Sequence, residues 1–280
     1  MSSPSDLRRY CLLGGLVDSS PSQHMMNAAF RSLGIPAEYT LLSVGQDLDG
    51  GMEAIRRGGF DGFNVTIPHK VGVVERLDRV DRASRSIGAV NTVKRAGGAY
   101  TGYNTDVDGI TRPLRSHFGD GGPASSLLLG AGGAARAFLW SMREMGCRRV
   151  SVLVRDLQKG RSLLEMPLRG MEVGLFGMDA TDLPRFELMF NATPLGSHGG
   201  EVPGRLLALA ARAEVFFDAV YQPAETGLVA AARDSGRKVI RGHEMLLEQG
   251  ASSFKIWTGR EAPRGTMREA LLSFLKVEAT

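Results

Sequence analysis

SSLLLGAGGAARAFLWSMREM, residues 125–145, places a glycine-rich turn directly between a short apolar run and a longer apolar segment. Residues 125–129 are expected to form a buried strand, and residues 134–145 a helix, because the second segment is longer and carries apolar residues at helical spacing. Glycine allows the tight turn between them and lets a ligand approach the backbone at the helix N-terminus. The stretch therefore predicts the first strand, turn and helix of a Rossmann-type domain.

The turn itself is the first candidate site, because its glycines suit the pyrophosphate of a dinucleotide cofactor. Its residues are Gly130, Ala131, Gly132, Gly133 and Ala134. Ala135 stands where a third glycine is common, a replacement that the dinucleotide fingerprint allows. The alternative interpretation is a closely packed helix start that binds nothing.

The end of the next expected strand, residues 149–154, offers groups for the ribose of such a cofactor. Arg155 and Lys159 could hold a 2′-phosphate through charge-assisted hydrogen bonds, which favours NADP. Asp156 could instead accept a hydrogen bond from a ribose 2′-hydroxyl, which keeps NAD possible. A solvated loop is the alternative interpretation of the two cations.

Strands and helices alternate over the rest of the chain. Downstream of the turn, strands are expected at residues 149–154, 171–176, 187–191, 214–218 and 238–240. Upstream, strands are expected at residues 10–17, 37–44 and 60–67, with helices at residues 22–33 and 49–57 and a hairpin of residues 87–94 and 99–103. Pro68 is expected to end a strand and begin a helix, because proline fits a first helical turn. The pattern predicts an α/β fold with a doubly wound, mostly parallel sheet.

Composition narrows the class of protein. The 280 residues are 43% hydrophobic and 23% charged, which is ordinary for a globular protein. No apolar run approaches the roughly 18 residues of a membrane helix, and no secretion signal is expected at the N-terminus. Cys11 and Cys147 have apolar neighbours, which favours buried thiols and a cytoplasmic location over disulfides.

The distribution of charge indicates which kinds of partner the protein could bind. The net charge is +4, but the arginines are scattered, so no nucleic-acid surface is expected. A mildly basic surface would instead attract small anions. The five histidines show no ligand spacing with cysteines or acids, so no metal site is expected either.

Short polar stretches recur at expected loops and strand ends. They are Ser20-Pro21-Ser22, Asn64-Val65-Thr66, and residues 88–92, 102–106 and 248–249. Each is unremarkable by itself, since Ser22 and Asp106 could simply cap helices. Together with Lys70, they form a set of donors and acceptors suited to a small polyhydroxylated acid.

Eight motifs make the chain similar to the shikimate dehydrogenase family. They are GGLVDSSPSQHMMNAAF (14–30), NVTIPHK (64–70), GAVNTV (88–93), GYNTDVDG (102–109), LLGAGGAARA (128–137), NATPLG (191–196), DAVYQPAET (218–226) and MLLEQGASSFKIWTG (245–259). They occur in family order and cover nearly the whole chain. The resemblance implies an enzyme that interconverts 3-dehydroshikimate and shikimate with NADP, in the biosynthesis of aromatic amino acids.

The same resemblance implies roles for single residues. Lys70 and Asp106 match the family's catalytic pair, and Ser20 and Ser22 match the serines that hold the substrate carboxylate. The positions around the ring hydroxyls are matched by Asn64, Thr66, Asn91, Tyr221 and Gln249. The rest of the cofactor groove is matched by Asn191, Thr193, Ala219 and Gly242. A lysine fits the chemistry, because hydride addition to a carbonyl builds negative charge that a cationic proton donor can neutralise.

The family also implies the division of the chain. Residues 1–106 would form an α/β substrate-binding and catalytic domain, and residues 107–242 a Rossmann-type NADP-binding domain, with a cleft between them. Helices within residues 243–280 could pack back onto the first domain. A small-molecule substrate and a monomeric or homodimeric enzyme are expected, with neither nucleic acid nor membrane as a partner.

Several positions depart from the family pattern. Leu16, Ser19, Gln23 and Met26 replace a proline, a histidine, a proline and a histidine, and Val154 replaces an asparagine. The usual GLGML becomes GHEML at residues 242–246, where His243-Glu244 could tune the nicotinamide pocket or face solvent. One alternative is therefore a quinate or aminoshikimate dehydrogenase that uses NAD. A second is a non-catalytic dinucleotide-binding regulator, which would need neither catalytic residue.

Overall fold

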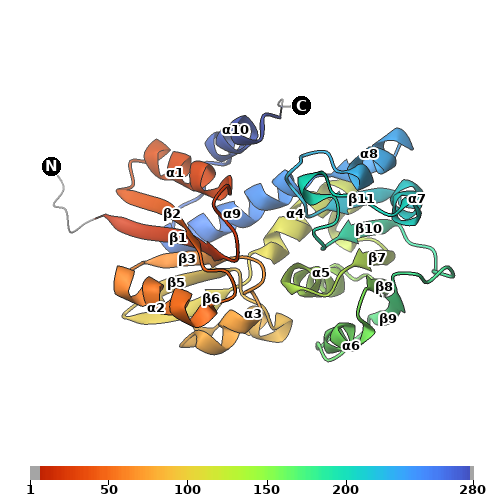
Figure 1. The fold of residues 1–280 in the computed structure, drawn as a ribbon, viewed down its shortest axis with the longest axis horizontal. Coiled ribbons are helices and arrows are strands. Elements are labelled where there is room, and N and C mark those ends of the chain that lie inside the picture. Colours follow the sequence, from red (N-terminus) through yellow and green to blue (C-terminus); the bar gives the residue numbers. More distant parts are fainter. Residues whose placement is uncertain (1–6, 278–280) are drawn as a thin grey trace. The chain divides into compact units, whose positions relative to one another are not determined.

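The structure, a computed structural model, describes residues 7–277 and divides into two compact units. Unit 1 comprises the chain up to Thr105 together with the part from Leu247 onward, and unit 2 comprises Asp106–Leu246. Each unit contains one six-stranded sheet (Figure 1). The predicted α/β class is confirmed, whereas the ligand that each unit binds stays a prediction at this point.

Unit 1 has a mixed sheet with strand order β2-β1-β3-β5-β6-β4. Its strands are β1 (Arg8–Gly14), β2 (Ala37–Ser43), β3 (Gly62–Val65), β4 (Arg79–Val80), β5 (Thr92–Ala96) and β6 (Ala99–Tyr103). Its helices are α1 (Ser22–Ser32), α2 (Leu48–Gly58), the 3₁₀ helix η2 (Gly72–Arg76), α3 (Arg82–Ile87) and α10 (Arg264–Leu275). The long helix α9 (Gly242–Thr258) enters this unit at Leu247.

The core of unit 1 explains why α9 belongs to it from Leu247 onward. Tyr10 of β1 stacks on Phe30 of α1 at 5.3 Å and on Trp257 of α9 at 4.7 Å between ring centroids. The indole Nε1 of Trp257 donates to the carbonyl oxygen of Val93 at 2.9 Å. Helices α1 and α9 therefore cover one face of the sheet, while α2 packs on the other face (Figure 1).

The predicted strand at residues 87–94 is partly wrong, because its first residue ends the helix α3. Asp81 caps that helix by accepting a hydrogen bond from the Ser84 backbone N–H at 2.9 Å. Gly88 ends it with a φ of 69°, a conformation that glycine adopts without steric cost. These cap signals, Asp before the helix and Gly after it, were present in the sequence. The strand β5 starts only at Thr92.

The helix predicted to begin at Pro68 is also wrong. The Ile67–Pro68 peptide is cis, and the chain continues in turns until η2 begins at Gly72. The backbone N–H of His69 donates to the carbonyl of Thr66 at 2.9 Å, which closes a turn over the proline. Proline is permitted in a first helical turn but does not require one.

Unit 2 has an all-parallel sheet with strand order β12-β11-β10-β7-β8-β9. Its strands are β7 (Ser125–Leu129), β8 (Arg149–Val154), β9 (Glu172–Gly177), β10 (Leu188–Asn191), β11 (Val215–Asp218) and β12 (Lys238–Ile240). Its helices are α4 (Asp106–Phe118), α5 (Gly133–Glu144), α6 (Leu157–Gly160), α7 (Gly204–Arg212) and α8 (Gly227–Asp234), with short 3₁₀ turns η3 (Gly119–Gly121), η4 (Arg161–Leu163) and η5 (Ser197–Gly199). This strand order is that of a Rossmann domain, so the prediction from residues 125–145 is confirmed.

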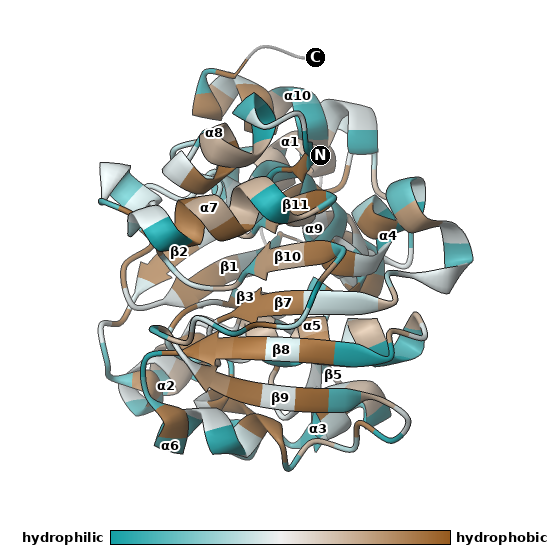
Figure 2. Cartoon of the chain, turned by 90° about the vertical axis from the view of Figure 1, so that its right-hand side faces the viewer, coloured by the Kyte–Doolittle hydropathy of each residue, from teal (hydrophilic) through white to brown (hydrophobic). Residues whose placement is uncertain are grey.

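Both faces of the unit 2 sheet are buried, which is why its strands are hydrophobic along most of their length (Figure 2). On the face covered by α4 and α5, Phe138 stacks on Phe190 at 4.6 Å between ring centroids. Helices α7 and α8 cover the other face with Leu206, Leu209 and Leu228. The order reverses between β7 and β10, and ligands of such sheets bind at the carboxyl ends of the strands next to this point.

Within the described residues, no helix has the length and apolar character that crossing a membrane requires. Both cysteines are buried free thiols, Cys11 in β1 and Cys147 just before β8.

Candidate functional site

Four predicted substrate residues of unit 1 lie near or after the carboxyl ends of the parallel strands β1 and β3. Asn64 is in β3 and Thr66 follows it, while Ser20 and Ser22 lie between β1 and the first turn of α1. Both serines are buried, and the backbone N–H of Ser22 donates to the Ser20 hydroxyl oxygen at 3.3 Å. The Ser20 hydroxyl is therefore held against the backbone of Ser22 at the start of α1, where the helix dipole favours a negative group.

Asn64 is held by a buried polar network. Its Oδ1 accepts a hydrogen bond from the Tyr39 hydroxyl at 2.8 Å. Its Nδ2 lies 3.0 Å from both the Thr92 and the Ser253 hydroxyl oxygens. Because the two amide hydrogens are engaged inside unit 1, Asn64 could meet a ligand only through Oδ1.

The same network contains Asn91 and Gln249. The Nδ2 of Asn91 donates to the Thr105 hydroxyl at 3.0 Å and to Oε1 of Gln249 at 3.2 Å. Its Oδ1 accepts from the Thr105 backbone N–H at 2.7 Å. The segments just before β5 and just after β6 are thus brought together with α9, whereas the roles of Asn91 and Gln249 at the substrate ring stay predictions.

Four members of this network were missed as site residues. Thr92 and Thr105 stand in quoted motifs beside predicted residues, and Ser253 stands in the last motif, so their polarity near a site was a usable signal. Tyr39 carries no such signal, because a tyrosine in a strand is normally read as core. It is fully buried, and its hydroxyl connects it to the site by donating to Asn64.

The predicted catalytic residues occupy the two units. Lys70 is half-buried in the turn after β3, and its carbonyl accepts from the Val90 backbone N–H at 2.8 Å. Asp106 is 2% exposed and is the first residue of α4 and of unit 2. It directly follows Thr105, which Asn91 fixes. The pairing of the Lys70 and Asp106 side chains stays a prediction.

The glycine turn of unit 2 has the shape that a pyrophosphate requires. Gly130 has a φ of 103°, and a Cβ there would lie 2.8 Å from Cγ2 of Thr193. Gly132 precedes α5 and has no side chain to cap it, and a Cβ on it would meet no atom within 4 Å. The first backbone N–H groups of α5 therefore receive no side-chain cap, and a helix start of this kind fits an anionic ligand.

The residues after β8 differ in their exposure and in their hydrogen bonds. Asp156 caps the short helix α6 by accepting from the Lys159 backbone N–H at 3.1 Å. Arg155 and Lys159 themselves are exposed. The Asp156 carboxylate thus already accepts a hydrogen bond from the backbone. In the sequence, the two cations flank Asp156.

The predicted groove residues of unit 2 differ in how deeply they are buried. Asn191 is fully buried, and its Oδ1 accepts from both the backbone N–H and the hydroxyl of Thr193, at 3.1 and 2.6 Å. The backbone N–H of Ala219 donates to the Asn191 carbonyl at 3.0 Å. Asn191 therefore shapes the loop that carries Thr193, while Thr193, Ala219 and Tyr221 are only partly buried.

Asp218 ends β11 next to this groove and is fully buried. Burial raises its pKa to about 6, an effect that hydrogen bonds from Thr226, Val220 and Asn191 partly oppose. It was not predicted as a site residue, although it opens the DAVYQPAET motif.

The pair His243-Glu244 lies in the first turn of α9. The carboxylate of Glu244 accepts from the Arg241 backbone N–H at 2.8 Å, so Glu244 serves as a helix cap. His243 is partly buried. Glu244 is also only partly buried, so both interpretations of the pair, a role in the nicotinamide pocket or a helix start that faces solvent, stay predictions.

Gly242 begins α9 where another part of the backbone approaches it closely. A Cβ on Gly242 would lie 2.3 Å from the carbonyl oxygen of Val220 and 2.8 Å from the backbone nitrogen of Tyr221. Gly242→Ala is therefore expected to lower the free energy of unfolding by about 2 kcal/mol, the usual cost of overpacking. Urea unfolding measures it. Gly204→Ala is the matched control, because Gly204 begins α7 with nothing within 4 Å; equal stability of the two variants would contradict the expectation.

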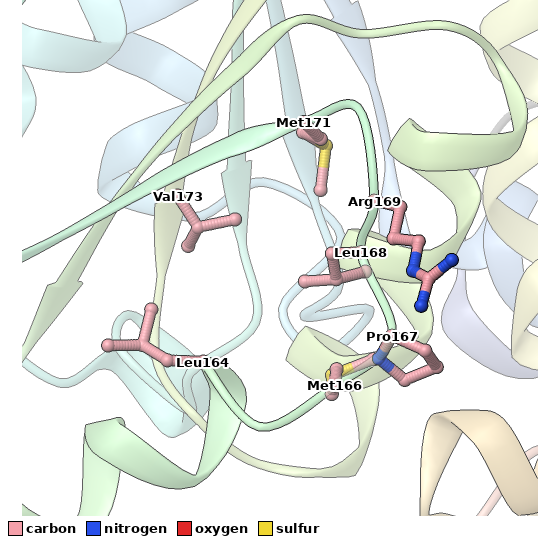
Figure 3. A pocket seen from close by; sticks show the side chains of 7 residues that line it. All are labelled: Leu164, Met166, Pro167, Leu168, Arg169, Met171 and Val173. Atoms are coloured by element: carbon pink, nitrogen blue, oxygen red, sulfur yellow. The ribbon is translucent and has the colours of Figure 1, made fainter.

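A surface hollow elsewhere on unit 2 is lined by Leu164, Met166, Pro167, Leu168, Arg169, Met171 and Val173 (Figure 3). These residues come from the segment between η4 and β9 and from β9 itself, and none of them is a predicted site residue. In the described part of the chain, no group of three or more His, Cys, Asp or Glu side chains could hold a metal ion.

Two family models match the chain. Residues 12–93 match the shikimate dehydrogenase substrate binding domain, and residues 242–272 match the shikimate 5'-dehydrogenase C-terminal domain. A curated relative, the shikimate dehydrogenase (NADP(+)) of Nitrosopumilus maritimus, is 34% identical over 95% of this chain and 98% of its own length.

Solved structures agree with this result. Shikimate 5-dehydrogenase of Thermus thermophilus, crystallised with NADP(H) and shikimate, is 33% identical with a TM-score of 0.80, covering 96% of this chain and all of the other. Quinate dehydrogenase of Corynebacterium glutamicum, crystallised with NAD, is 29% identical with a TM-score of 0.82, covering 96% of this chain and 99% of the other.

Proposed function

We propose that this chain, which belongs to the shikimate dehydrogenase family, catalyses the NADP-dependent interconversion of 3-dehydroshikimate and shikimate. The observation that carries the proposal is the 34% identity to a shikimate dehydrogenase (NADP(+)) across 98% of that enzyme's length. In this role the protein is an oxidoreductase acting on a CH–OH group in the biosynthesis of aromatic amino acids. The free thiols of both cysteines suit a cytoplasmic location.

Unit 1 would bind the substrate. The hydroxyls of Ser20 and Ser22, two buried serines at the start of α1, would hold the carboxylate, because hydroxyl donors and the helix dipole both favour an anion. Asn91, Gln249 and Thr66 would meet the ring hydroxyls. Asn64 would act mainly by fixing the Thr92 and Ser253 hydroxyls, since its own amide hydrogens are engaged. Tyr221 of unit 2 would complete the set.

Unit 2 would bind the cofactor, and its residues fit one. The uncapped backbone N–H groups at the start of α5 would hold the pyrophosphate, and Arg155 and Lys159 the 2′-phosphate. Bound NADPH supplies the hydride. The two exposed cations beside Asp156 in the sequence, Arg155 and Lys159, favour NADP over NAD, because only NADP carries a phosphate there for them to bind.

Lys70 and Asp106 would carry out the proton transfer that accompanies hydride transfer. As the ketone carbon of 3-dehydroshikimate gains a hydride, its oxygen gains negative charge and takes a proton from the Lys70 ammonium group. The Asp106 carboxylate would orient the Lys70 ammonium group for this transfer. Solvent then returns a proton to Lys70. Oxidation of shikimate follows the same steps in reverse.

Quinate oxidation with NAD is the second candidate, favoured by the likeness to quinate dehydrogenase and by GHEML in place of GLGML. Initial rates with shikimate and quinate, each paired with NADP and NAD, separate the two functions. The highest kcat/KM is expected for shikimate with NADP. A higher value for quinate with NAD would overturn the proposal. No turnover in any combination, with NADP still bound, would favour the regulator.

A further inference from the structure

Asp218 is an unusual residue to keep at the carboxyl end of a Rossmann strand, because its carboxylate is fully buried. Burying an ionised carboxylate is costly unless hydrogen bonds replace its hydration. Here three donors do so: Nδ2 of Asn191 at 2.9 Å, the backbone N–H of Val220 at 3.0 Å and the Thr226 hydroxyl at 2.6 Å. The hydroxyl bond has the short length typical of an ionised acceptor.

The three donors belong to two different loops. Asn191 ends β10 and holds Thr193 in the loop that follows. Val220 and Thr226 bracket the loop after β11, which contains Tyr221 and ends where Thr226 caps α8 through the Val229 backbone N–H. The two oxygens of Asp218 therefore connect the loop assigned to the cofactor with the loop assigned to the substrate.

The start of α9 packs against the loop after β11. The Val220–Tyr221 peptide lies so close to Gly242 that a side chain on Gly242 could not be accommodated. A shift of Val220 away from Asp218 would therefore also disturb the first turn of α9, which Glu244 caps. Three segments, the two loops and this helix start, have positions that depend on one carboxylate.

We propose that Asp218 is a positioning residue that sets the Thr193 loop and the Tyr221 loop together, and so couples cofactor binding to substrate binding. The inference rests on the proposed function for the identity of the two ligands. Asp218 itself touches neither ligand. Its charge serves to order three neutral donors, a task that an uncharged residue of the same shape performs less well.

Asp218→Asn is the central variant, because asparagine keeps the shape and removes the charge. The KM for NADP and the KM for shikimate are both expected to rise about tenfold, the effect of losing one charge-assisted hydrogen bond. Asn191→Ala should raise mainly the KM for NADP, and Thr226→Val mainly the KM for shikimate. Thr226→Ser, which keeps the hydroxyl, should restore the parent value.

Stability distinguishes positioning from a merely structural role. The native pKa of about 6 lies above the unfolded value of about 3.9, so the native state binds the extra proton between these pH values. Any stabilisation from this site is present below about pH 4 and is lost as the pH rises through about 6. The groups that face Asp218 from β10, its own loop and the start of α8 are Asn191, Val220 and Thr226, none of which titrates.

The thermal midpoint of the parent, measured relative to Asp218→Asn, is therefore expected to fall between pH 4 and pH 7. At neutral pH the variant should be at least as stable as the parent and yet bind both ligands less well. If Asp218→Asn unfolds more readily and both KM values stay at the parent level, the positioning role is refuted. A rise in only one KM would refute the coupling. Calorimetric titration, done in parallel, measures the affinity for NADP. It therefore reports on the Thr193 loop even if the protein has no activity on shikimate.

Discussion

Lys70→Ala is expected to lower kcat for shikimate oxidation by a factor of about 100 to 10,000, the range that general acid–base catalysis contributes. The lysine is the cation available in the NVTIPHK turn of unit 1, and the proposal gives it the proton of the reacting oxygen. The KM for NADP should change little, because the cofactor residues lie in unit 2. Steady-state kinetics and NADP titration measure the two effects separately.

Lys94→Ala is the matched control. Lys94 is another half-buried lysine of unit 1, but its Nζ donates to the backbone carbonyl of Ile256 in α9 at 2.7 Å. Its loss should lower stability and leave kcat near the parent value, the reverse of the result at Lys70. A Lys70→Ala protein that turns over as fast as the parent would remove Lys70 from the mechanism. Asp106→Asn tests the pairing, since its effect should not add to that of Lys70→Ala.

Arg155→Ala is expected to raise the KM for NADP by about 10 to 100-fold and to leave the KM for NAD unchanged, because only NADP carries the 2′-phosphate. Adding Lys159→Ala should deepen the loss. The ratio of kcat/KM for the two cofactors reports the change directly and is insensitive to the fraction of active protein.

Arg149→Ala is the control for charge. Arg149 is exposed at the first residue of β8, whereas Arg155 follows the last residue of the same strand. Removing either arginine changes the net charge equally, but only Arg155 stands at the ligand-binding end of the sheet. Equal losses of NADP affinity in the two variants would mean that unit 2 attracts the cofactor through its overall charge and has no specific 2′-phosphate site there.

The sequence predicted the Rossmann unit well because its signals are local. The glycine turn, the apolar strands and the lengths of the helices each depend on a few neighbouring residues, and the structure has them at the expected places. Asn91 and Gln249 differ from these elements, because they lie together although 158 positions separate them in sequence. Their contact came from resemblance to a family, since no local pattern specifies it.

The errors have physical causes as well. The strand predicted at residues 87–94 followed hydrophobicity and overlooked the caps of α3, and Pro68 was assigned a helix that proline only permits. The contact of Asn64 with the substrate stays a prediction, and the buried network, which uses its Nδ2, leaves its Oδ1 for that contact. Tyr39 and Asp218 could not be found from the sequence, because burial and tertiary hydrogen bonds alone give them their roles.

Transfer of deuterium from NADPD to 3-dehydroshikimate tests the central claim most directly. The product is predicted to be shikimate with deuterium on the carbon that carried the ketone, formed by the parent protein and about 100-fold or more slowly by Lys70→Ala. Mass spectrometry and proton NMR identify both the product and the labelled position. Binding of NADP without any transfer of deuterium to 3-dehydroshikimate would contradict the account.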